Sequence, residues 1–283
     1  MAQTSLNVYT DLSQETKDNL AEILGGVVEN IQTSAVSEAI KNKKGSGDPE
    51  AGVINYKRFV NAQLKSKGTA RTAGKGTPVQ DANVPVNLND DKEIVEELQK
   101  KDIKLLGVDG LAEKRKGNFS KRIAAYLDTK FFGVAKTEGT AYDGDSTAAK
   151  AIVDDMIVTA KNTSSNFIDG IDADDLCIVL DGTFRKAVKN ALDQLPNGTK
   201  ASNGQIGVYD GIDVYESNRL PSGVHCFVML KEAIAEPWYV SDYDVEKIPF
   251  DDAIALENFL YCGCKALNPE AIYYYAESGS ATV

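Results

Sequence analysis

The sequence has a single histidine among its 283 residues, which limits the catalytic sites that the chain can build. A Ser-His-Asp triad would have to use His225, which lies in the apolar run 224–230. Ser222 is close in sequence, but its neighbours do not resemble a nucleophile elbow. We therefore expect His225 to be an ordinary strand residue, and we predict that the protein is not an enzyme.

Cysteine is also scarce, with Cys177, Cys226, Cys262 and Cys264 as the full set. A structural zinc site usually has four Cys or His ligands in two pairs, and only Cys262 and Cys264 are closely spaced. The sequence predicts no metal and no cofactor. The four thiols are expected to be reduced, as in a protein made in a cytoplasm, and to pack as small apolar side chains.

Long apolar runs and an excess of basic residues are missing as well. No run approaches the ~20 apolar residues of a membrane helix, and residues 1–19 have no apolar core of a secretory signal. The chain has 31 Lys and Arg against 42 Asp and Glu, which gives a formal charge of −11. This balance argues against a chain-wide coat on nucleic acid, because phosphate neutralisation needs an excess of bases.

Motifs for small ligands are incomplete. The run Ala73–Thr77 resembles a phosphate loop, but Thr69 stands where the motif needs Gly and Gly76 where it needs Ser or Thr. The acidic loop at Asp143 has Ala148 at the position where a calcium loop of the EF-hand type needs Gly. The acids that occur in pairs are typical of solvated surfaces, so no acid-base pair is predicted.

What the sequence does contain is a long two-stranded hairpin over Val53–Asn89. Apolar and polar residues alternate in both halves, and residues 66–78 between them have the composition of a loop. Such a ribbon is marginal alone in water, so we expect it to lie on another surface. Between Val53 and Gln80 there is no acid. The bases there are Lys57, Arg58, Lys65, Lys67, Arg71 and Lys75.

Residues 236–257 carry the opposite charge, with seven acids against Lys247 alone. Two hypotheses stay open. Both segments are solvated faces of a monomer, or the hairpin of one copy lies across the acidic strands of the next. The second contact is head-to-tail and closes into rings. Its predicted acceptors are Asp242, Asp244, Glu246, Asp251, Asp252 and Glu257.

Helices are predicted mainly in the first half of the chain. Apolar spacing indicates a helix over 12–41, capped by Ser13 and kinked at Gly25-Gly26, followed by a flexible linker over 43–52. The elements expected after the hairpin are a charged helix over 90–101, a strand or turn over 103–108 and a long helix over 109–132.

Strands are predicted mainly in the second half, so the fold class is α+β. Asp181 is expected to begin a helix, and Asp210-Gly211 to form a hairpin turn. The elements expected are a helix over 145–161, strands over 176–180, 205–209, 212–216 and 224–230, and extended chain over 238–276.

Two stretches carry a family resemblance. GQIGVYDGIDVYESNRLP over Gly204–Pro221 resembles a motif of the major capsid proteins of tailed bacteriophages, and YCGCKALNPEAI over Tyr261–Ile272 is similar to their C-terminal ending. The order of an arm, a long hairpin, a long helix, a compact part and returning strands is similar too. The resemblance implies the Hong Kong 97-type capsid fold.

It also implies a division of the chain. Residues 1–52 would be the N-terminal arm and 53–89 the extended hairpin loop. Residues 90–139 and 246–283 would form the peripheral domain, with a spine helix over 109–134. Residues 140–245 would form the axial domain.

The function implied is that of a shell subunit. The chain would assemble with itself into pentamers and hexamers, and then into an icosahedral or prolate head around double-stranded DNA, which it contacts only non-specifically. Scaffolding and portal proteins would be further partners, and no membrane is involved. The subunit would belong to the virion and assemble in the host cytoplasm. The prototype of this family joins its subunits by a Lys–Asn bond. Lys65, Lys67 or Lys75 could face Asn258 or Asn268 here, but nothing in the sequence demands such a bond.

Two alternatives remain. An encapsulin-type shell has the same fold in a cellular setting, and an α+β enzyme is the other class.

Overall fold

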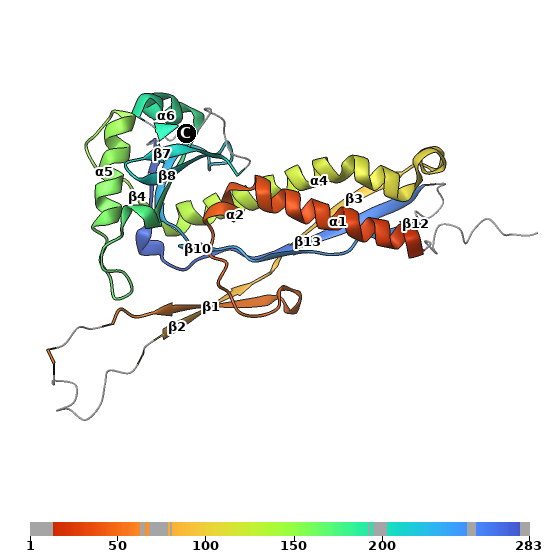
Figure 1. The fold of residues 1–283 in the computed structure, drawn as a ribbon, viewed down its shortest axis with the longest axis horizontal. Coiled ribbons are helices and arrows are strands. Elements are labelled where there is room, and N and C mark those ends of the chain that lie inside the picture. The colour runs from red at the N-terminus through yellow and green to blue at the C-terminus, as the bar shows by residue number, and fades with distance from the viewer. Residues whose placement is uncertain are drawn as a thin grey trace, which may run out of the picture.

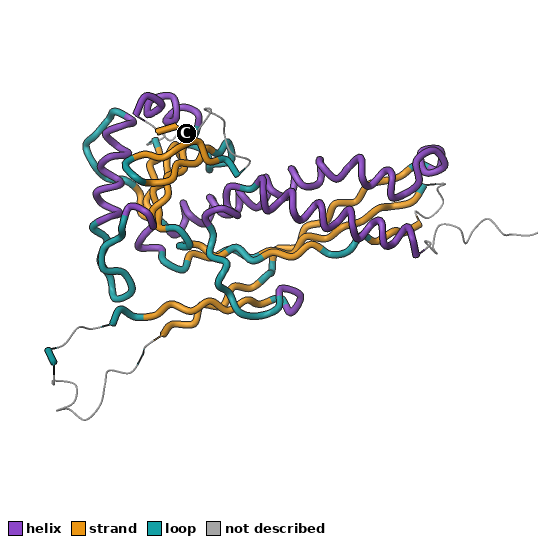
Figure 2. The backbone as a smooth tube through the Cα atoms, viewed as in Figure 1, coloured by secondary structure: helices purple, strands orange, loops and turns teal. Residues whose placement is uncertain are grey.

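The computed structural model describes residues 14–62, 66–67, 79, 81–191, 193–194, 203–247 and 253–277. Figure 1 shows an elongated body, in which the helices α1 (Gln14–Ser34) and α4 (Lys100–Glu138) lie along a narrow sheet. It also shows a compact body and a projecting two-stranded hairpin. In Figure 2 the long helices lie on one side of the strands of the elongated body. The predicted α+β class is confirmed.

The predicted helix over 12–41 forms in two pieces. α1 is followed by α2 (Val36–Ile40), and the break lies at Ala35, whose backbone is extended. The kink predicted at Gly25-Gly26 is wrong, since both residues stay helical. A Cβ at Gly26 would meet only the end of the flexible Lys116 side chain of α4. Ser13 lies outside the described residues.

The helix predicted over 90–101 is wrong. Residues Asp90–Leu98 form strand β3, which pairs with β13 (Ile254–Cys262) along its whole length. Ile94 and Leu98 point toward the helices and pack in their core, and Glu96 on the same face pairs with Arg115 of α4. The acids at alternate positions, Asp91, Glu93 and Glu97, point outward. Long-range pairing with an apolar strand thus overrides the local helix propensity of a segment rich in Glu and Lys.

The strand or turn predicted over 103–108 is also wrong as an element of its own, because α4 already begins at Lys100. The backbone departs from helical geometry at Gly107, which has a φ of 75° and joins two helical pieces. A side chain would strain this position, which explains a glycine there. The second piece is the predicted long helix, and it continues to Glu138.

The elongated sheet has β13 at its centre. β11 (Trp238–Val240) and β12 (Asp244–Lys247) pair with different parts of β13, and β3 pairs with its other edge, all antiparallel. The inward side chains of β13, such as Leu256 and Leu260, pack against α1 and α4. One face of this sheet is therefore covered by helices and the other is not.

The compact body contains a seven-stranded sheet in the order β4-β15-β9-β5-β8-β7-β6. α5 (Ala149–Lys161) and α6 (Gly182–Val188) pack on it, and Asp181 caps α6 by accepting from the Phe184 N–H at 2.8 Å, as predicted. The predicted strands and the Asp210-Gly211 turn are confirmed. The strands are β4 (Thr140–Ala141), β5 (Leu176–Leu180), β6 (Asp193–Gln194), β7 (Gln205–Tyr209), β8 (Ile212–Glu216), β9 (Val224–Leu230) and β15 (Ile272–Ala276).

The hairpin consists of β1 (Val53–Phe59) and β2 (Asp81–Asn87), joined by seven antiparallel residue pairs. β1 ends at Phe59 and thus earlier than its apolar pattern predicts. Short elements complete the chain: β10 (Ile234–Ala235) paired with β14 (Lys265–Ala266), and the 3-10 turns Pro49–Ala51, Ala173–Asp175, Lys189–Ala191 and Pro269–Ala271.

The strand pairing divides the chain differently from the sequence prediction in two places. β11 belongs to the elongated sheet, and β15 belongs to the seven-stranded sheet. The two bodies share a core, because Phe131 and Phe132 near the end of α4 pack with Phe227 of β9. α4 therefore joins both bodies through buried contacts.

Candidate functional site

The uncovered face of the elongated sheet is lined with carboxylates. Paired residues in a ladder share a face, and alternate residues along a strand return to it. Asp244 lies opposite Glu257, and Ala255 is flanked by Glu246 on one side and Glu97 on the other. We call this surface the acidic face, and its members are Asp91, Glu93, Glu97, Asp244, Glu246 and Glu257.

The acidic face has a strongly negative local field. The outward positions of β3, β12 and the described part of β13 include no Lys or Arg. Partial burial raises the pKa of Glu257, and the carboxylates of Glu246, Asp244 and Glu93 raise it further. A surface of this kind favours a cationic partner.

The sequence analysis predicted only half of the residues of the acidic face. Asp244, Glu246 and Glu257 were predicted, and the structure brings them together. Asp91, Glu93 and Glu97 were missed because their segment was taken for a helix. Their alternate positions are a weak strand signal, because Val95 on the outward face and Glu96 on the inward face break the alternation of polar and apolar residues.

Two other predicted acceptors cannot be placed, and one lies beside the face. Asp242 is exposed in the connection between β11 and β12. Asp251 and Asp252 lie outside the described residues.

The hairpin is attached to its own chain at its base. Ile54, Tyr56 and Val86 form an apolar cluster with residues of the body that include Ala235 and Leu267, and Tyr239 and Tyr261 pack against it. Tyr239 and Tyr261 occupy outward positions of the sheet. The expectation that the hairpin needs another surface is thus met in part within the chain, and its base sits at one end of the sheet face that carries the acids.

Arg58 of the hairpin contacts residues of its own chain. Its guanidinium forms an ion pair with Glu270 and lies 3.9 Å from the centre of the Phe167 ring. Ser165 Oγ donates to the same Glu270 oxygen at 3.2 Å. Only 16% of the Arg58 side chain is exposed, so the structure gives it a role in seating the hairpin on its own body.

Of the other predicted bases, two are exposed and three lie outside the described residues. Lys57 pairs with Asp81 of the partner strand at 3.2 Å, with both side chains exposed. Lys67 is exposed. Lys65, Arg71 and Lys75 lie outside the described residues.

Asn258 is not placed for a bond to a neighbouring lysine. Its side chain is 3% exposed, and its Nδ2 donates to the Ser241 carbonyl at 2.6 Å. Asn268 is partly exposed and lies just before the 3-10 turn that begins at Pro269.

His225 lies in β9, as predicted, and its ring has structural partners. Nδ1 lies 2.6 Å from Asp181 Oδ2, and the ring stacks on Phe184 at 5.5 Å between centres. The group facing Nε2 is the Glu277 carboxylate, at 3.6 Å. These contacts tie β9 to the start of α6.

The cysteines are free and mostly buried. Burial raises the pKa of Cys177 to about 12 and that of Cys262 to about 11, so both are thiols at neutral pH. Within the described part of the chain, no cluster of three or more His, Cys, Asp or Glu could hold a metal ion. In the same part, no helix is long and apolar enough to cross a membrane.

Comparisons with known proteins give a match in structure alone. No protein-family model and no curated protein matches the chain. A structure from Mycobacterium phage Che8 matches with a TM-score of 0.59 at 15% identity, covering 87% of this chain and 92% of that one. The capsid of Ralstonia phage GP4 matches with a TM-score of 0.53 at 11% identity, covering 79% and 83%.

The chain has the Hong Kong 97-type capsid fold. A virus-like particle from Pyrococcus furiosus also matches, with a TM-score of 0.51 at 10% identity, covering 93% of this chain and 98% of that one. The fold implied by the two sequence motifs is confirmed. In this Hong Kong 97-type fold, Gly204–Pro221 contains β7 and β8, and Tyr261–Ile272 runs from the end of β13 to the start of β15.

Proposed function

We propose that this chain is the major capsid protein of a tailed phage, and that copies of it form pentamers, hexamers and then an icosahedral or prolate shell around double-stranded DNA. The fold supports this proposal. The observation that carries it is that the hairpin base and the acidic face share one side of the elongated sheet. From this base the strands β1 and β2 extend away from β12 (Figure 1).

The contact between copies is the hairpin of one subunit lying across the acidic face of the next. Arg58 already pairs with Glu270 of its own chain. The bases that remain to contact the neighbouring subunit are Lys57, Lys65, Lys67, Arg71 and Lys75. Single exposed ion pairs contribute roughly 0–1 kcal/mol each. Many such pairs, repeated around a ring of subunits, nevertheless add up through multivalency.

Parts of the chain take separate roles in this proposal. Residues 1–52 are an arm, 53–89 the hairpin loop, and 90–139 with 246–283 the peripheral domain, whose spine is α4, except that β15 joins the axial sheet. Residues 140–245 are the axial domain, except that β11 and the start of β12 join the peripheral sheet. Scaffolding and portal proteins are further partners, and the DNA is contacted non-specifically. The subunit is assembled in the host cytoplasm, becomes part of the virion and catalyses no reaction.

Electron microscopy of the expressed protein tests the shell, and charge reversal tests the contact. One variant carries Lys65→Glu, Lys67→Glu, Arg71→Glu and Lys75→Glu. A second carries Glu93→Lys, Asp244→Lys, Glu246→Lys and Glu257→Lys. Each should give folded, soluble subunits without shells, and the combined variant should recover shells. Shells from either variant alone would refute the contact.

A cellular nanocompartment is the second candidate, because the virus-like particle from Pyrococcus furiosus has a similar fold. Particles purified from the natural source separate the two functions. Packaged DNA supports the phage head, whereas a packaged enzyme in place of DNA supports the nanocompartment.

A further inference from the structure

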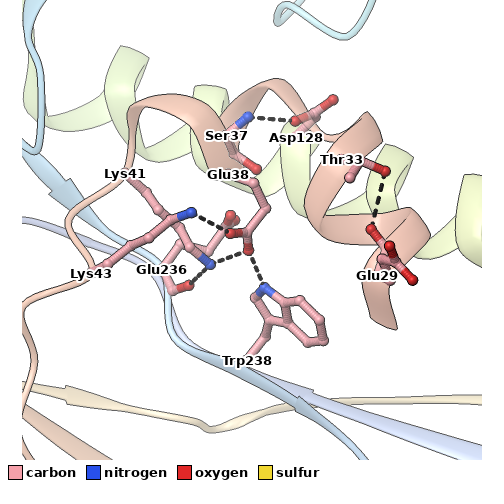
Figure 3. A network of polar contacts seen from close by, with 9 residues as sticks. All are labelled: Glu29, Thr33, Ser37, Glu38, Lys41, Lys43, Asp128, Glu236 and Trp238. Carbon is pink, nitrogen blue, oxygen red and sulfur yellow. Dashed lines mark hydrogen bonds and ion pairs between the residues drawn. The ribbon is translucent and has the colours of Figure 1, made fainter. Parts of the chain in front are cut away.

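The short helix α2 rests on three buried carboxyl groups, shown in Figure 3. Glu38 belongs to α2, Asp128 to α4, and Glu236 to the segment between β10 and β11. Their exposed fractions are 4%, 0% and 0%. Three acids in so little space would repel strongly if all were charged, so their partners decide which of them are ionised.

Two of the three have donors. Asp128 Oδ1 accepts from the Ser37 N–H at 2.9 Å, and Arg219 Nη1 lies 3.5 Å from its other oxygen. Glu38 accepts from Lys41 and from Trp238 Nε1, and Lys43 lies 3.3 Å away. Lys41 and Lys43 hold the pKa of Glu38 below its usual value against the opposing effect of burial. Glu38 is thus ionised at neutral pH.

Glu236 differs from both. Neither of its carboxyl oxygens forms a hydrogen bond of good geometry among the described residues, and both are shielded from solvent. The hydroxyl of Ser37, which also lacks a good partner, lies near enough to act as a weak donor. Lys41 Nζ donates at 2.9 Å to the main-chain oxygen of Glu236. An ionised carboxylate left without donors in the interior is very costly, whereas a neutral carboxylic acid is much less so.

Both acidic and basic side chains surround Glu236. α2 and the residues after it present Glu38, Lys41 and Lys43, and α4 presents Asp128 and Lys130. The end of β13 and the turn after it present Cys262 and Cys264. Burial raises the pKa of Glu236 to about 8; Lys41 and the hydroxyl of Ser37 act against burial, and Asp128 and Glu38 act with it.

We propose that Glu236 binds a proton in the folded chain, and that loss of this proton loosens α2 from the body. α2 leads through residues 41–52 directly into β1 of the hairpin. A cavity of about 670 Å³, lined by Tyr56 and Trp238 among others, lies between the hairpin base and β11 and leaves room for such a movement. The proposal concerns the subunit alone and does not depend on the function proposed above.

The direction of the effect follows from linkage. A carboxyl group whose folded pKa lies above its unfolded value stabilises the fold below the unfolded value, and this stabilisation is lost as the pH rises toward the folded value. The relevant interval here runs from 4.5 to about 8. Between pH 6.5 and pH 9, the equilibrium constant for opening this region should rise about thirtyfold.

The single tryptophan, Trp238, reports on the cluster, because its indole is bonded to Glu38. In the full-length wild-type chain, tryptophan emission should shift with a midpoint near pH 8. Hydrogen exchange of the amides in 35–44, corrected for intrinsic exchange rates, should accelerate about thirtyfold between pH 6.5 and pH 9. Glu236→Gln should abolish both changes. Glu232→Gln, at a partly exposed acid nearby that pairs with Lys44, should keep them.

The outcomes are distinct. A pH response that is unchanged in Glu236→Gln overturns the proposal, as does a wild-type chain without any response between pH 6.5 and pH 9. If Glu236→Gln does not fold, carbon-13 labelling of glutamate carboxyls in the wild-type chain measures the titration directly. One carboxyl with a midpoint near 8 supports the proposal, and its absence refutes it.

Discussion

Asp244 and Glu257 stand directly opposite each other on the acidic face, as paired residues of β12 and β13. Like charges at such positions repel and oppose pairing of the strands. The pKa of Glu257 is raised, first by partial burial and then by Glu246, Asp244 and Glu93. Folding of the single chain does not require these two carboxylates to face each other. Binding of a basic segment would relieve the repulsion between them.

Glu257→Gln should therefore make the isolated subunit more stable and its assembly weaker. We expect the Tm to rise by roughly one to two degrees. Wild-type stability should fall as the pH rises from the unfolded to the folded pKa of Glu257, and the variant should lack this part of the slope. Thermal unfolding from pH 4 to pH 8 and particle yield measure the two effects. Glu22→Gln, at an exposed acid of α1, should change neither; a lower Tm for Glu257→Gln would contradict the idea.

The contact of Arg58 with Glu270 and Phe167 should make a measurable contribution to stability. We expect Arg58→Ala to cost about 1–2 kcal/mol in urea unfolding, because it removes a mostly buried ion pair and a cation–π contact. Arg58→Lys keeps the charge but loses the planar stacking, so it should recover only part of this cost. Lys57→Ala removes an exposed pair one residue away and should cost less than about 0.5 kcal/mol. An equal loss of stability in Arg58→Ala and Lys57→Ala would mean that Arg58 does not hold the hairpin on the body.

Asp90 should protect the fold at neutral pH and lose this role in acid. Burial tends to raise its pKa, but hydrogen bonds from Lys130, Tyr126 and Lys92 hold it well below its usual range. We expect Asp90→Asn to cost about 1 kcal/mol at pH 7. The difference from wild type should shrink as the pH falls below about 4, since the stabilisation is lost toward the folded pKa.

Asp91→Asn is the control for that experiment. It changes an exposed acid next to Asp90 and should alter stability by less than about 0.5 kcal/mol. Urea unfolding at several pH values compares the two variants. A constant deficit for Asp90→Asn down to pH 2 would show that its charge is not the cause.

Two glycines should respond oppositely to alanine. A Cβ at Gly263 would meet the main chain of Asn87 at the hairpin base, so Gly263→Ala should cost about 1–3 kcal/mol. Gly133 lies inside α4 with nothing within 4 Å of an added Cβ, so Gly133→Ala should stabilise by about 0.5–1 kcal/mol. Chemical denaturation measures both, and a neutral result at Gly263 would show that the hairpin base is not closely seated.

The sequence predicts this fold best where a strand or helix has a clear signal in its own residues. β5 is a continuous apolar run, and β7 and β8 are joined by an Asp-Gly turn. It fails over 90–101, because the charged residues there favour a helix in isolation and only pairing with β13 makes a strand. Gly107 was similarly ambiguous, since a glycine ends a helix as readily as it kinks one.

The candidate site was predictable in its charge and not in its geometry. The basic hairpin and the acids of 236–257 are visible as composition. The seating of Arg58 on Glu270 joins residues 212 positions apart, which no local pattern reveals. The buried carboxyl of Glu236 is likewise a property of packing, because a glutamate before a proline looks like an ordinary surface residue in the sequence.

The connection between β2 and β3 has a mechanical consequence. Leu88 and Asn89 alone separate the end of the hairpin from the start of β3, and the two strands run on in nearly the same direction (Figure 1). Tension on the hairpin therefore passes straight into β3 and loads its nine-residue ladder with β13 in shear. In shear the hydrogen bonds resist together instead of opening one at a time. In the proposed assembly, the hairpin that would contact one neighbour is therefore continuous with the strand that would contact another, so a closed ring of subunits would carry strain along one line.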